Sequence, residues 1–218
     1  MRALPGLTVM ARWPAPRRCK RRLTGDLSEQ LHLLRPGERA ARMQRRLTAH
    51  TMAVAGSLSR SGHLDLTLAV SGLAPKAAER WGRALGADQV CLQSGSSLGC
   101  RMRHLLMRTS RQRRGSPALL IGSDLPSLSR TDLLLAIEGL QEHDLVLGPS
   151  VDGGYWLIGM APTLMQRPEA WPLSGIAWGS NRVLRQTKAK ADAQGLSVEL
   201  LRTQQDLDHL SDMRPWLS

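Results

Sequence analysis

Short apolar runs alternate with longer amphipathic segments along most of the chain, and this alternation restricts the fold more than any other feature. The stretch SPALLIG at 116–122 is as apolar as a strand that is covered on both faces. We expect strands at 6–11, 64–70, 88–93, 116–122, 144–149, 155–160 and 196–201, and helices at 36–58, 74–86, the second half of 96–114, 129–143 and 181–195. This order predicts a three-layer α/β/α sandwich with a mainly parallel sheet, and 218 residues fit a single domain, 1–218.

The segment 12–26 interrupts this alternation. It contains Pro14 and Pro16 and the basic run RRCKRR, and the proline spacing predicts a basic loop rather than a helix. Lys20 and Arg22 in this loop could neutralise a diphosphate, although a solvated basic loop is the simpler interpretation. Neither GxxxxGK[ST] nor GxGxxG occurs there, which excludes a P-loop and a dinucleotide fingerprint.

The net charge of +12, from 30 basic and 18 acidic residues, favours a polyanionic partner. That partner could be a nucleic acid, an anionic membrane or a small substrate with phosphates, and a solvated surface would also explain the charge. No aromatic residues interleave with the arginines, which argues against nucleic acid. No apolar run approaches the roughly 18 residues of a membrane span, so none is expected.

Cysteine and histidine usage excludes several kinds of site. The three cysteines, Cys19, Cys91 and Cys100, form no CxxC pair, which predicts a reducing cytoplasm and neither a disulfide framework nor a zinc site. The histidines form no HxH or HxxxH pair, and the apolar stretch at the N-terminus is too short for a signal peptide. We therefore expect a cytoplasmic protein.

Asp124 stands two residues beyond the end of the apolar run at 116–122. Ligands of open parallel sheets bind at the carboxyl ends of the strands, and a carboxylate there can hold Mg²⁺ or Mn²⁺ against substrate phosphates. Ser129 already supplies the N-cap of the next expected helix, with Asp132 in its first turn, so Asp124 is not needed for capping. The alternative is an Asp that bonds its own turn.

Two further stretches carry candidate residues. In 147–159, Asp152-Gly153-Gly154 predicts a hairpin between two strands, and the glycines would let a ligand approach the backbone closely. After the last expected strand, QQDLDHLSDM contains Asp206, Asp208 and Asp212, which are either an acidic helix start or metal partners of Asp124. Asp206 and Asp208 would point in similar directions only if their segment is not helical.

Taken together, these stretches resemble the arsenosugar-biosynthesis-type glycosyltransferases, a family long listed as a domain of unknown function within the nucleotide-diphospho-sugar transferase superfamily. The segment 119–160 is similar to the family's G-x-D-x-P followed by D-x-V-L-G-P-x-x-D-G-G-Y. QSGSSLGCRM (93–102) is similar to Q-x-G-x-x-L-G-x-R-M, with Cys100 where an acid is usual, and DLDHLSD to D-x-D-T-P-x-D without the Thr-Pro. RWPAPRRCKRRL departs from K-x-P-x-P-G-x-x-K-T-R-L, with Arg17 in place of the glycine and Arg21 in place of the threonine.

The resemblance implies a glycosyltransferase A-like fold that binds a nucleotide and a divalent metal, Mg²⁺ or Mn²⁺. It implies metal binding by Asp124 with Asp208, or less directly Asp206. It implies nucleotide or substrate binding by Lys20, Arg22, Arg101, Gly122, Gly153 and Gly154. Asp152 would hold sugar hydroxyls or act as the base for the acceptor.

Three functions remain open. The first is a glycosyltransferase with a nucleotide-diphospho-sugar donor and a small-molecule acceptor. The second is a nucleotidyltransferase that joins a nucleoside triphosphate to a phosphorylated small molecule, which would use the same acids, metal and cationic loop. The third is a non-catalytic basic binding protein on the same scaffold, suggested by the charge of +12 and the altered loop.

Overall fold

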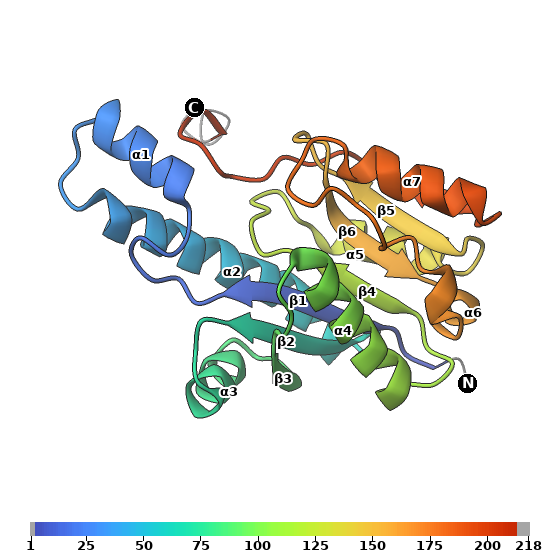
Figure 1. Cartoon of the computed structure of the whole chain (residues 1–218). Helices are drawn as coiled ribbons and strands as arrows, with labels where there is room; N and C mark the ends of the chain where they lie inside the picture. The colour runs from blue at the N-terminus through green and yellow to red at the C-terminus, as the bar shows by residue number, and fades with distance from the viewer. Residues whose placement is uncertain (1–2, 213–218) are drawn as a thin grey trace.

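The computed structural model describes residues 3–212, which form a seven-stranded sheet between two layers of helices (Figure 1). The strand order is β3-β2-β1-β4-β6-β5-β7, and β6 is antiparallel to both of its neighbours while the other pairs are parallel. The strands are β1 (Gly6–Arg12), β2 (Asp65–Ser71), β3 (Gln89–Leu92), β4 (Ala118–Ile121), β5 (Leu145–Pro149), β6 (Tyr155–Met160) and β7 (Val198–Leu200). The α/β sandwich with a mainly parallel sheet is therefore confirmed.

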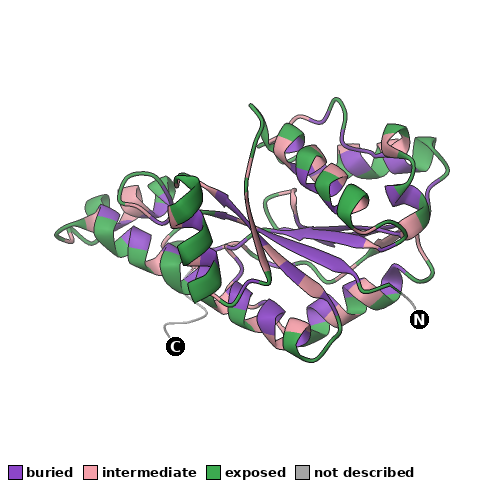
Figure 2. Ribbon diagram, turned by 90° about the horizontal axis from the view of Figure 1, so that it is seen from below, coloured by how far each residue is buried: buried purple, intermediate pink, exposed green. Residues whose placement is uncertain are grey.

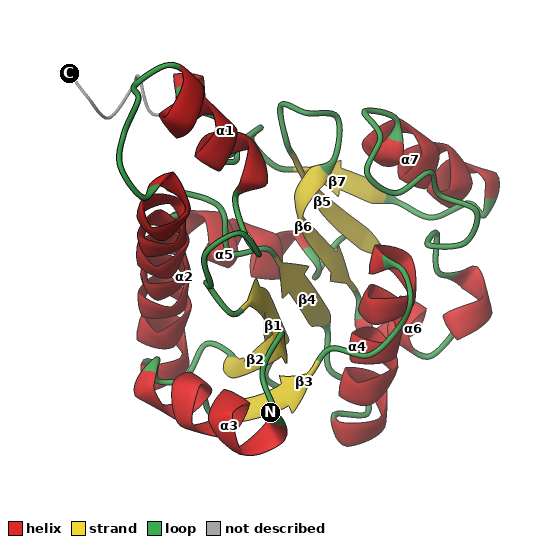
Figure 3. Cartoon of the chain, turned by 60° about the vertical axis from the view of Figure 1, so that its left-hand side comes forward, coloured by secondary structure: helices red, strands yellow, loops and turns green. Residues whose placement is uncertain are grey.

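The helices divide between the two faces of the sheet (Figure 3). They are α1 (Arg21–Glu29), α2 (Pro36–Arg60), α3 (Pro75–Ala84), α4 (Leu98–Gln112), α5 (Arg130–Gly139), α6 (Pro162–Met165) and α7 (Val183–Ala193), with a 3₁₀ turn at Pro168–Ala170. One core packs α2, α3 and α5 against the sheet, and a second core packs α4, α6 and α7 against the other face. Leu119 and Ile121 of β4 enter the first core, whereas Ala118 and Leu120 enter the second. This alternation explains why the β4 run is continuously apolar and why the strands lie buried in the middle of the molecule (Figure 2).

The order of the strands places a crevice beside β1. β1 pairs in parallel with β2 on one side and with β4 on the other, and the chain builds β2 and β3 before it crosses to β4. The direction of winding reverses between β1 and β4, and such a switch point is where open α/β sheets bind ligands. The carboxyl ends of β1 and β4 are the ends that carry the loop of Lys20 and the loop of Asp124.

Helix α1 corrects one prediction. We expected a loop throughout 12–26, but the effect of the two prolines ends before Lys20 and a helix begins at Arg21. Leu23 and Leu27 of α1 pack against Leu47 of α2 and Leu207 near the C-terminus, and this apolar contact stabilises a helix too short to persist alone. Helix α6 and the 3₁₀ turn were also not predicted.

The C-terminal strap, residues 201–212, runs back across the carboxyl edge of the sheet to α1. Residues 206–208 are not helical, which excludes the helix-start interpretation for Asp206 and Asp208. The backbone N–H of Leu207 donates to the carbonyl of Asp124 (3.1 Å), and Asp26 of α1 accepts from the N–H of Leu210 (2.9 Å). Met213, the last residue of the stretch QQDLDHLSDM, lies outside the described residues.

No helix among residues 3–212 is long and apolar enough to cross a membrane. The three cysteines are unpaired thiols: Cys19 is buried, Cys91 is partly buried and Cys100 is exposed. The predicted hairpin is present, because β5 and β6 pair antiparallel across the turn at 150–154.

Candidate functional site

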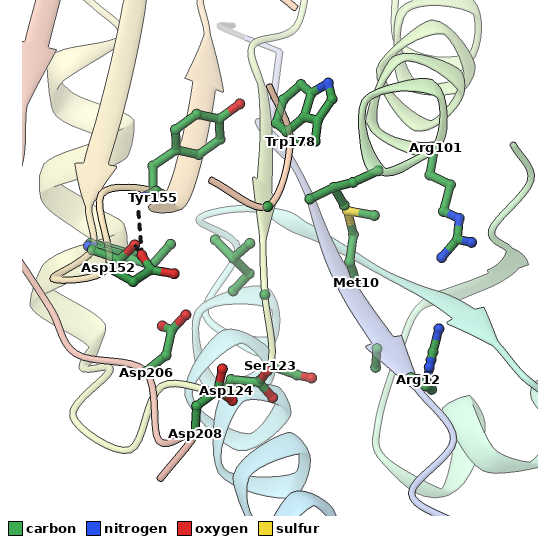
Figure 4. Close-up of a pocket in the computed structure, with 18 of the residues that line it drawn as sticks. Met10, Arg12, Arg101, Ser123, Asp124, Asp152, Tyr155, Trp178, Asp206 and Asp208 are labelled. Carbon is green, nitrogen blue, oxygen red and sulfur yellow. Dashed lines mark hydrogen bonds between the residues drawn. The ribbon is translucent and has the colours of Figure 1, made fainter. Parts of the chain in front are cut away.

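A cavity of about 610 Å³ opens at the carboxyl ends of β1 and β4, where the strand order predicts a ligand site. Four carboxylates line one side, here called the acidic wall: Asp124, Asp152, Asp206 and Asp208. Arg12 and Arg101 lie on the opposite side (Figure 4). The cavity therefore separates charge between two walls.

Asp124 is held from two directions. The side-chain N–H of Gln44 donates to Asp124 Oδ1 (2.7 Å), and the Lys20 ammonium lies 3.3 Å from Oδ2. Ser129 caps α5, as predicted, and Asp132 returns the bond in a reciprocal capping box, which leaves Asp124 free of any capping role. Asp124 is 41% exposed, so its carboxylate is oriented by the protein but open to the cavity.

Lys20 forms the centre of the acidic wall. Its side chain is 2% exposed, and Nζ lies 2.9 Å from Asp208 Oδ1 as well as 3.3 Å from Asp124. Burial by itself lowers the pKa of Lys20, but the charges of Asp124 and Asp208 outweigh it and the pKa lies above its usual value. The ammonium therefore stays charged and joins the loop after β4 to the C-terminal strap.

Asp212 stabilises the turn of the C-terminal strap that positions Asp206 and Asp208 at the cavity. The Asp212 carboxylate accepts from the backbone N–H of Asp208 (2.8 Å) and of His209 (2.6 Å), and from the side chain of Gln205 (2.8 Å). Asp212 is thus a turn-forming residue, whereas Asp206 and Asp208 line the cavity.

Burial and the clustering of carboxylates in the acidic wall raise the pKa of Asp206. Burial, together with the negative charges of Asp124, Asp152 and Asp208, raises its pKa to about 7. The folded protein therefore retains a proton on Asp206 at pH values where the unfolded chain has lost it. The wall holds more negative charge than Lys20 neutralises.

We expect Asp206→Asn to stabilise the protein in a metal-free buffer. Because the folded pKa is raised, the native Asp206 destabilises the fold progressively as pH rises from about 4 to about 7. The variant should gain about 2 kcal/mol in unfolding free energy at pH 8 and almost nothing at pH 3.5, as measured by urea denaturation. Asp192→Asn, on the exposed side of α7, is the control. An equal gain at both pH values would contradict the electrostatic cause.

Asp152 lies in the hairpin turn at the edge of the acidic wall. Its Oδ1 accepts from the Ser150 hydroxyl and from the N–H of Gly154 (3.0 Å), so the residue forms the turn as well as facing the cavity. Gly153 has φ +85°, and a Cβ there would lie 2.2 Å from the carbonyl oxygen of Asn181. The close approach at Gly153 is therefore made by the chain itself, while Gly154 lines the cavity.

Arginines from the end of β1, from the loop after it, from α1 and from α4 also line the cavity. They are Arg12, Arg18, Arg21, Arg22 and Arg101. Arg22 is 67% exposed and lies 3.7 Å from Asp208, beside the acidic wall, whereas Arg101, on the opposite side, donates to the carbonyl of Gly95 (3.1 Å). Guanidinium groups with free N–H donors suit phosphate oxygens.

The basic loop after β1 has a left-handed backbone at the position where the resemblance expects glycine. Arg17, at the position where the resemblance expects glycine, has φ +64°, in the left-handed region that glycine adopts without strain. Lys20 is also left-handed, with φ +48°. The loop therefore turns as a glycine would allow, and Lys20 is directed inward.

Between the two walls the cavity is lined by apolar and aromatic side chains. Met10, Tyr155 and Trp178 lie there, with the two rings 6.3 Å apart in an edge-to-face arrangement (Figure 4). Gly122 is on the same surface, and apart from its chain neighbours no atom of residues 3–212 lies within 4 Å of the position that its Cβ would occupy. A planar group could therefore approach the backbone at Gly122.

The sequence did not identify Gln44, because it occurs in the amphipathic pattern of α2 among arginines. Its position on the buried side of that helix is the only signal that sequence offers, since a polar residue there needs a partner. Trp178 was also missed, because the segment 161–180 has no periodic pattern.

The acidic wall fits a divalent cation that is shared with a substrate. Its donors are carboxylate oxygens, which Mg²⁺ and Mn²⁺ prefer. Among residues 3–212 no group of three acidic, His or Cys side chains would hold a metal alone. Mg²⁺ commonly uses one or two carboxylates and completes its shell with water and phosphates, and Asp124 with Asp208 or Asp206 matches that requirement.

Comparison with solved structures supports the fold. A candidate nucleotide-diphospho-sugar transferase from Desulfovibrio desulfuricans G20 is 26% identical, with a TM-score of 0.78 over 94% of this chain and 82% of that one. A 4-diphosphocytidyl-2C-methyl-D-erythritol synthase is 12% identical, with a TM-score of 0.59 over 99% and 97% of the chains. CMP:2-keto-3-deoxy-manno-octonic acid synthetase in complex with CTP is 9% identical, with a TM-score of 0.57 over 98% and 97%. The last two similarities concern the fold alone.

Comparison with protein families identifies the chain. No curated protein matches it. The family model described as an uncharacterized protein conserved in bacteria (DUF2064) matches residues 36–180, from the start of α2 to the loop before α7. Since this match covers more than half of the sequence, the chain belongs to the DUF2064 family, and its fold is that of the nucleotide-diphospho-sugar transferases.

Proposed function

We propose that residues 1–218 form a single catalytic domain that transfers a sugar from a nucleotide-diphospho-sugar to a small-molecule acceptor with the help of Mg²⁺ or Mn²⁺. The observation that carries this proposal is the meeting of Asp124 and Asp208 on one buried ammonium, Lys20, opposite a wall of arginines. A diphosphate placed between these walls would have cations on one side and metal-binding acids on the other. The similarity to the transferase from D. desulfuricans supports the same substrate class.

Two carboxylates would bind the metal, and neighbouring side chains orient these carboxylates. Asp124 and Asp208, or Asp206, would bind the metal, which when bound supplies charge stabilisation for the leaving diphosphate. Gln44 and Lys20 fix the orientation of Asp124, and Lys20 prevents repulsion between Asp124 and Asp208. These contacts are made by the protein's own residues, which lowers the reorganisation that the reaction requires.

The remaining walls bind the substrate. Arg22 and Arg101 would contact the phosphates, and the open backbone at Gly122 would accommodate the nucleoside. Asp152, at the hairpin turn with Gly154, would hold sugar hydroxyls or accept the proton of the acceptor hydroxyl. Its second carboxylate oxygen has no hydrogen bond to the described residues, which leaves it available for either role.

Nucleotidyl transfer is the second candidate. Five arginines line the cavity, and a nucleoside triphosphate, with one phosphate more than a nucleotide-diphospho-sugar, could contact more of them. The two reactions differ in their products, because glycosyl transfer releases a nucleoside diphosphate and nucleotidyl transfer releases pyrophosphate.

We expect sugar nucleotides to raise the melting temperature of the protein only when Mn²⁺ is present. A ligand at 100 times its Kd stabilises the folded state by about 2.7 kcal/mol, which corresponds to roughly 5–10 °C for a chain of this size. A thermal-shift screen of nucleoside diphosphates, triphosphates and sugar nucleotides, with Mn²⁺ and with EDTA, measures this effect. The ligands that bind are then assayed for nucleoside diphosphate and pyrophosphate release.

Each outcome of that screen selects one function. Release of nucleoside diphosphate supports glycosyl transfer, and release of pyrophosphate replaces it with nucleotidyl transfer. Binding of DNA or RNA with a steep salt dependence, and of no nucleotide, would instead establish the non-catalytic binding protein and refute both reactions.

A further inference from the structure

The loop between α1 and α2 exposes leucines that the core does not use. Leu34 is 84% exposed and Leu31 is 47% exposed, whereas Leu33 between them packs with α1 and α2. His32 and Arg35 have positive φ values of 46° and 54°, so the loop backbone itself turns Leu31 and Leu34 outward. The loop lies at one end of the molecule, beyond the sheet, in two views (Figures 1 and 3).

A row of arginines continues along α2 from this loop, whose residues 30–35 are here called the leucine tip. Arg35, Arg39, Arg42 and Arg46 follow helical spacing and are all exposed, so they form one face of the helix, here called the arginine face. Arg35 pairs with Glu38 at 3.7 Å, and no ion pair among residues 3–212 involves Arg42 or Arg46. The arginine face therefore keeps its positive charge for an external partner.

We propose that this leucine tip and the arginine face dock on the surface of an anionic lipid bilayer. Exposed leucines gain free energy when they enter the boundary between headgroups and acyl chains, and arginines beside them pair with anionic headgroups. Exposed leucines and exposed arginines are each common on protein surfaces. Here they are continuous along one loop and one helix, so the leucines can enter the boundary of the acyl chains while the arginines contact the headgroups. The protein has no spanning helix in residues 3–212, so the contact is peripheral and reversible.

Two other occupants fit this surface less well. Nucleic acid would use the arginines, but it offers no apolar layer for Leu31 and Leu34, and α1 and α2 contain no aromatic residue for stacking on bases. A second copy of the chain could cover the leucines, but a two-fold contact would bring the arginine face against itself. The bilayer satisfies the apolar and the charged parts together.

Co-sedimentation with vesicles tests the proposal independently of any enzymatic activity. The full chain should bind vesicles of equal parts phosphatidylglycerol and phosphatidylcholine, and should not bind pure phosphatidylcholine. Arg42→Glu with Arg46→Glu should weaken binding by at least about 30-fold, because each lost arginine near the surface contributes about a factor of five and the new glutamates are repelled by the anionic headgroups. Leu34→Ser should weaken it about fivefold without any change in charge.

The matched control reverses the same number of charges elsewhere. Arg185→Glu with Lys188→Glu changes two exposed cations of α7, on a different part of the molecule, and should leave vesicle binding within about twofold of the native protein. If both double variants lose the same vesicle affinity, net charge alone explains the binding and the proposed docking surface is wrong. The absence of binding to anionic vesicles, or an unchanged affinity in Leu34→Ser, would overturn it as well. Circular dichroism confirms that each variant is folded.

Discussion

Asp124→Asn should lower kcat/KM for the nucleotide-diphospho-sugar donor by about 10³-fold, the largest catalytic effect that we expect from one substitution. Asparagine keeps the oxygen that accepts from Gln44, and Lys20 keeps its pair with Asp208, but the substitution removes the negative charge that pairs with Lys20 and that would hold the metal. The loss should appear mainly in kcat, and the melting temperature without ligand should change by only a few degrees. Steady-state kinetics with Mn²⁺ and thermal unfolding measure the two effects.

The control for this variant is Asp192→Asn, which removes the same charge from the exposed side of α7. It should keep the native kcat/KM and the Mn²⁺-dependent rise in melting temperature, whereas Asp124→Asn should lose that rise. If Asp124→Asn retains both the activity and the Mn²⁺ response, the role of Asp124 as a metal ligand is wrong. A loss of activity with a full Mn²⁺ response would assign the metal to Asp206 and Asp208 instead.

Asp132→Ala should lower the unfolding free energy by about 3 kcal/mol, the largest effect on stability. Asp132 is 3% exposed and accepts two bonds from the guanidinium of Arg202, while its reciprocal bonds with Ser129 cap α5. The substitution therefore removes the cap and leaves Arg202 with only its bond to the carbonyl of Ser127 (2.9 Å). Because Arg202 anchors the first part of the C-terminal strap to α5, the loss should also weaken Mn²⁺ binding by Asp208. Urea denaturation and the Mn²⁺-dependent thermal shift measure these effects.

The effect of Asp132 should depend on pH. Burial by itself raises the pKa of Asp132, but the bonds from Arg202 and Ser129 outweigh it and the pKa lies below its ordinary value. The carboxylate therefore contributes its full stability above about pH 4, and the contribution is lost as pH falls through the folded pKa. The difference between native protein and Asp132→Ala should be largest at pH 7 and should shrink at pH 3.

The control on the same helix is Glu138→Ala, an exposed residue without a described ion pair. It should change the unfolding free energy by less than about 0.5 kcal/mol. Equal effects of Asp132→Ala and Glu138→Ala would show that the contact between α5 and the strap contributes nothing.

The sequence by itself determined the fold class and the position of Asp124 at a strand end, where it lines the cavity. Local patterns are sufficient for both, because the alternation of apolar runs and amphipathic helices reflects burial in a sandwich, and a strand end in such a sheet is a ligand position. The cap at Ser129 was also readable, since a capping box depends on residues three positions apart. These predictions use interactions that are close in the chain.

The tertiary structure alone decided how the site is assembled. Lys20 and Asp208 are 188 positions apart, and Gln44 and Asp124 are 80 apart, so no local pattern connects them. The sequence left Lys20 either in a solvated basic loop or against a diphosphate, whereas the structure buries its ammonium between two carboxylates. Helix α1 and the C-terminal strap likewise depend on a shared apolar contact, Leu23 and Leu27 with Leu207. Long-range pairing of this kind is decided by the free energy of packing and charge neutralisation in the folded state, which the order of residues along the chain does not express.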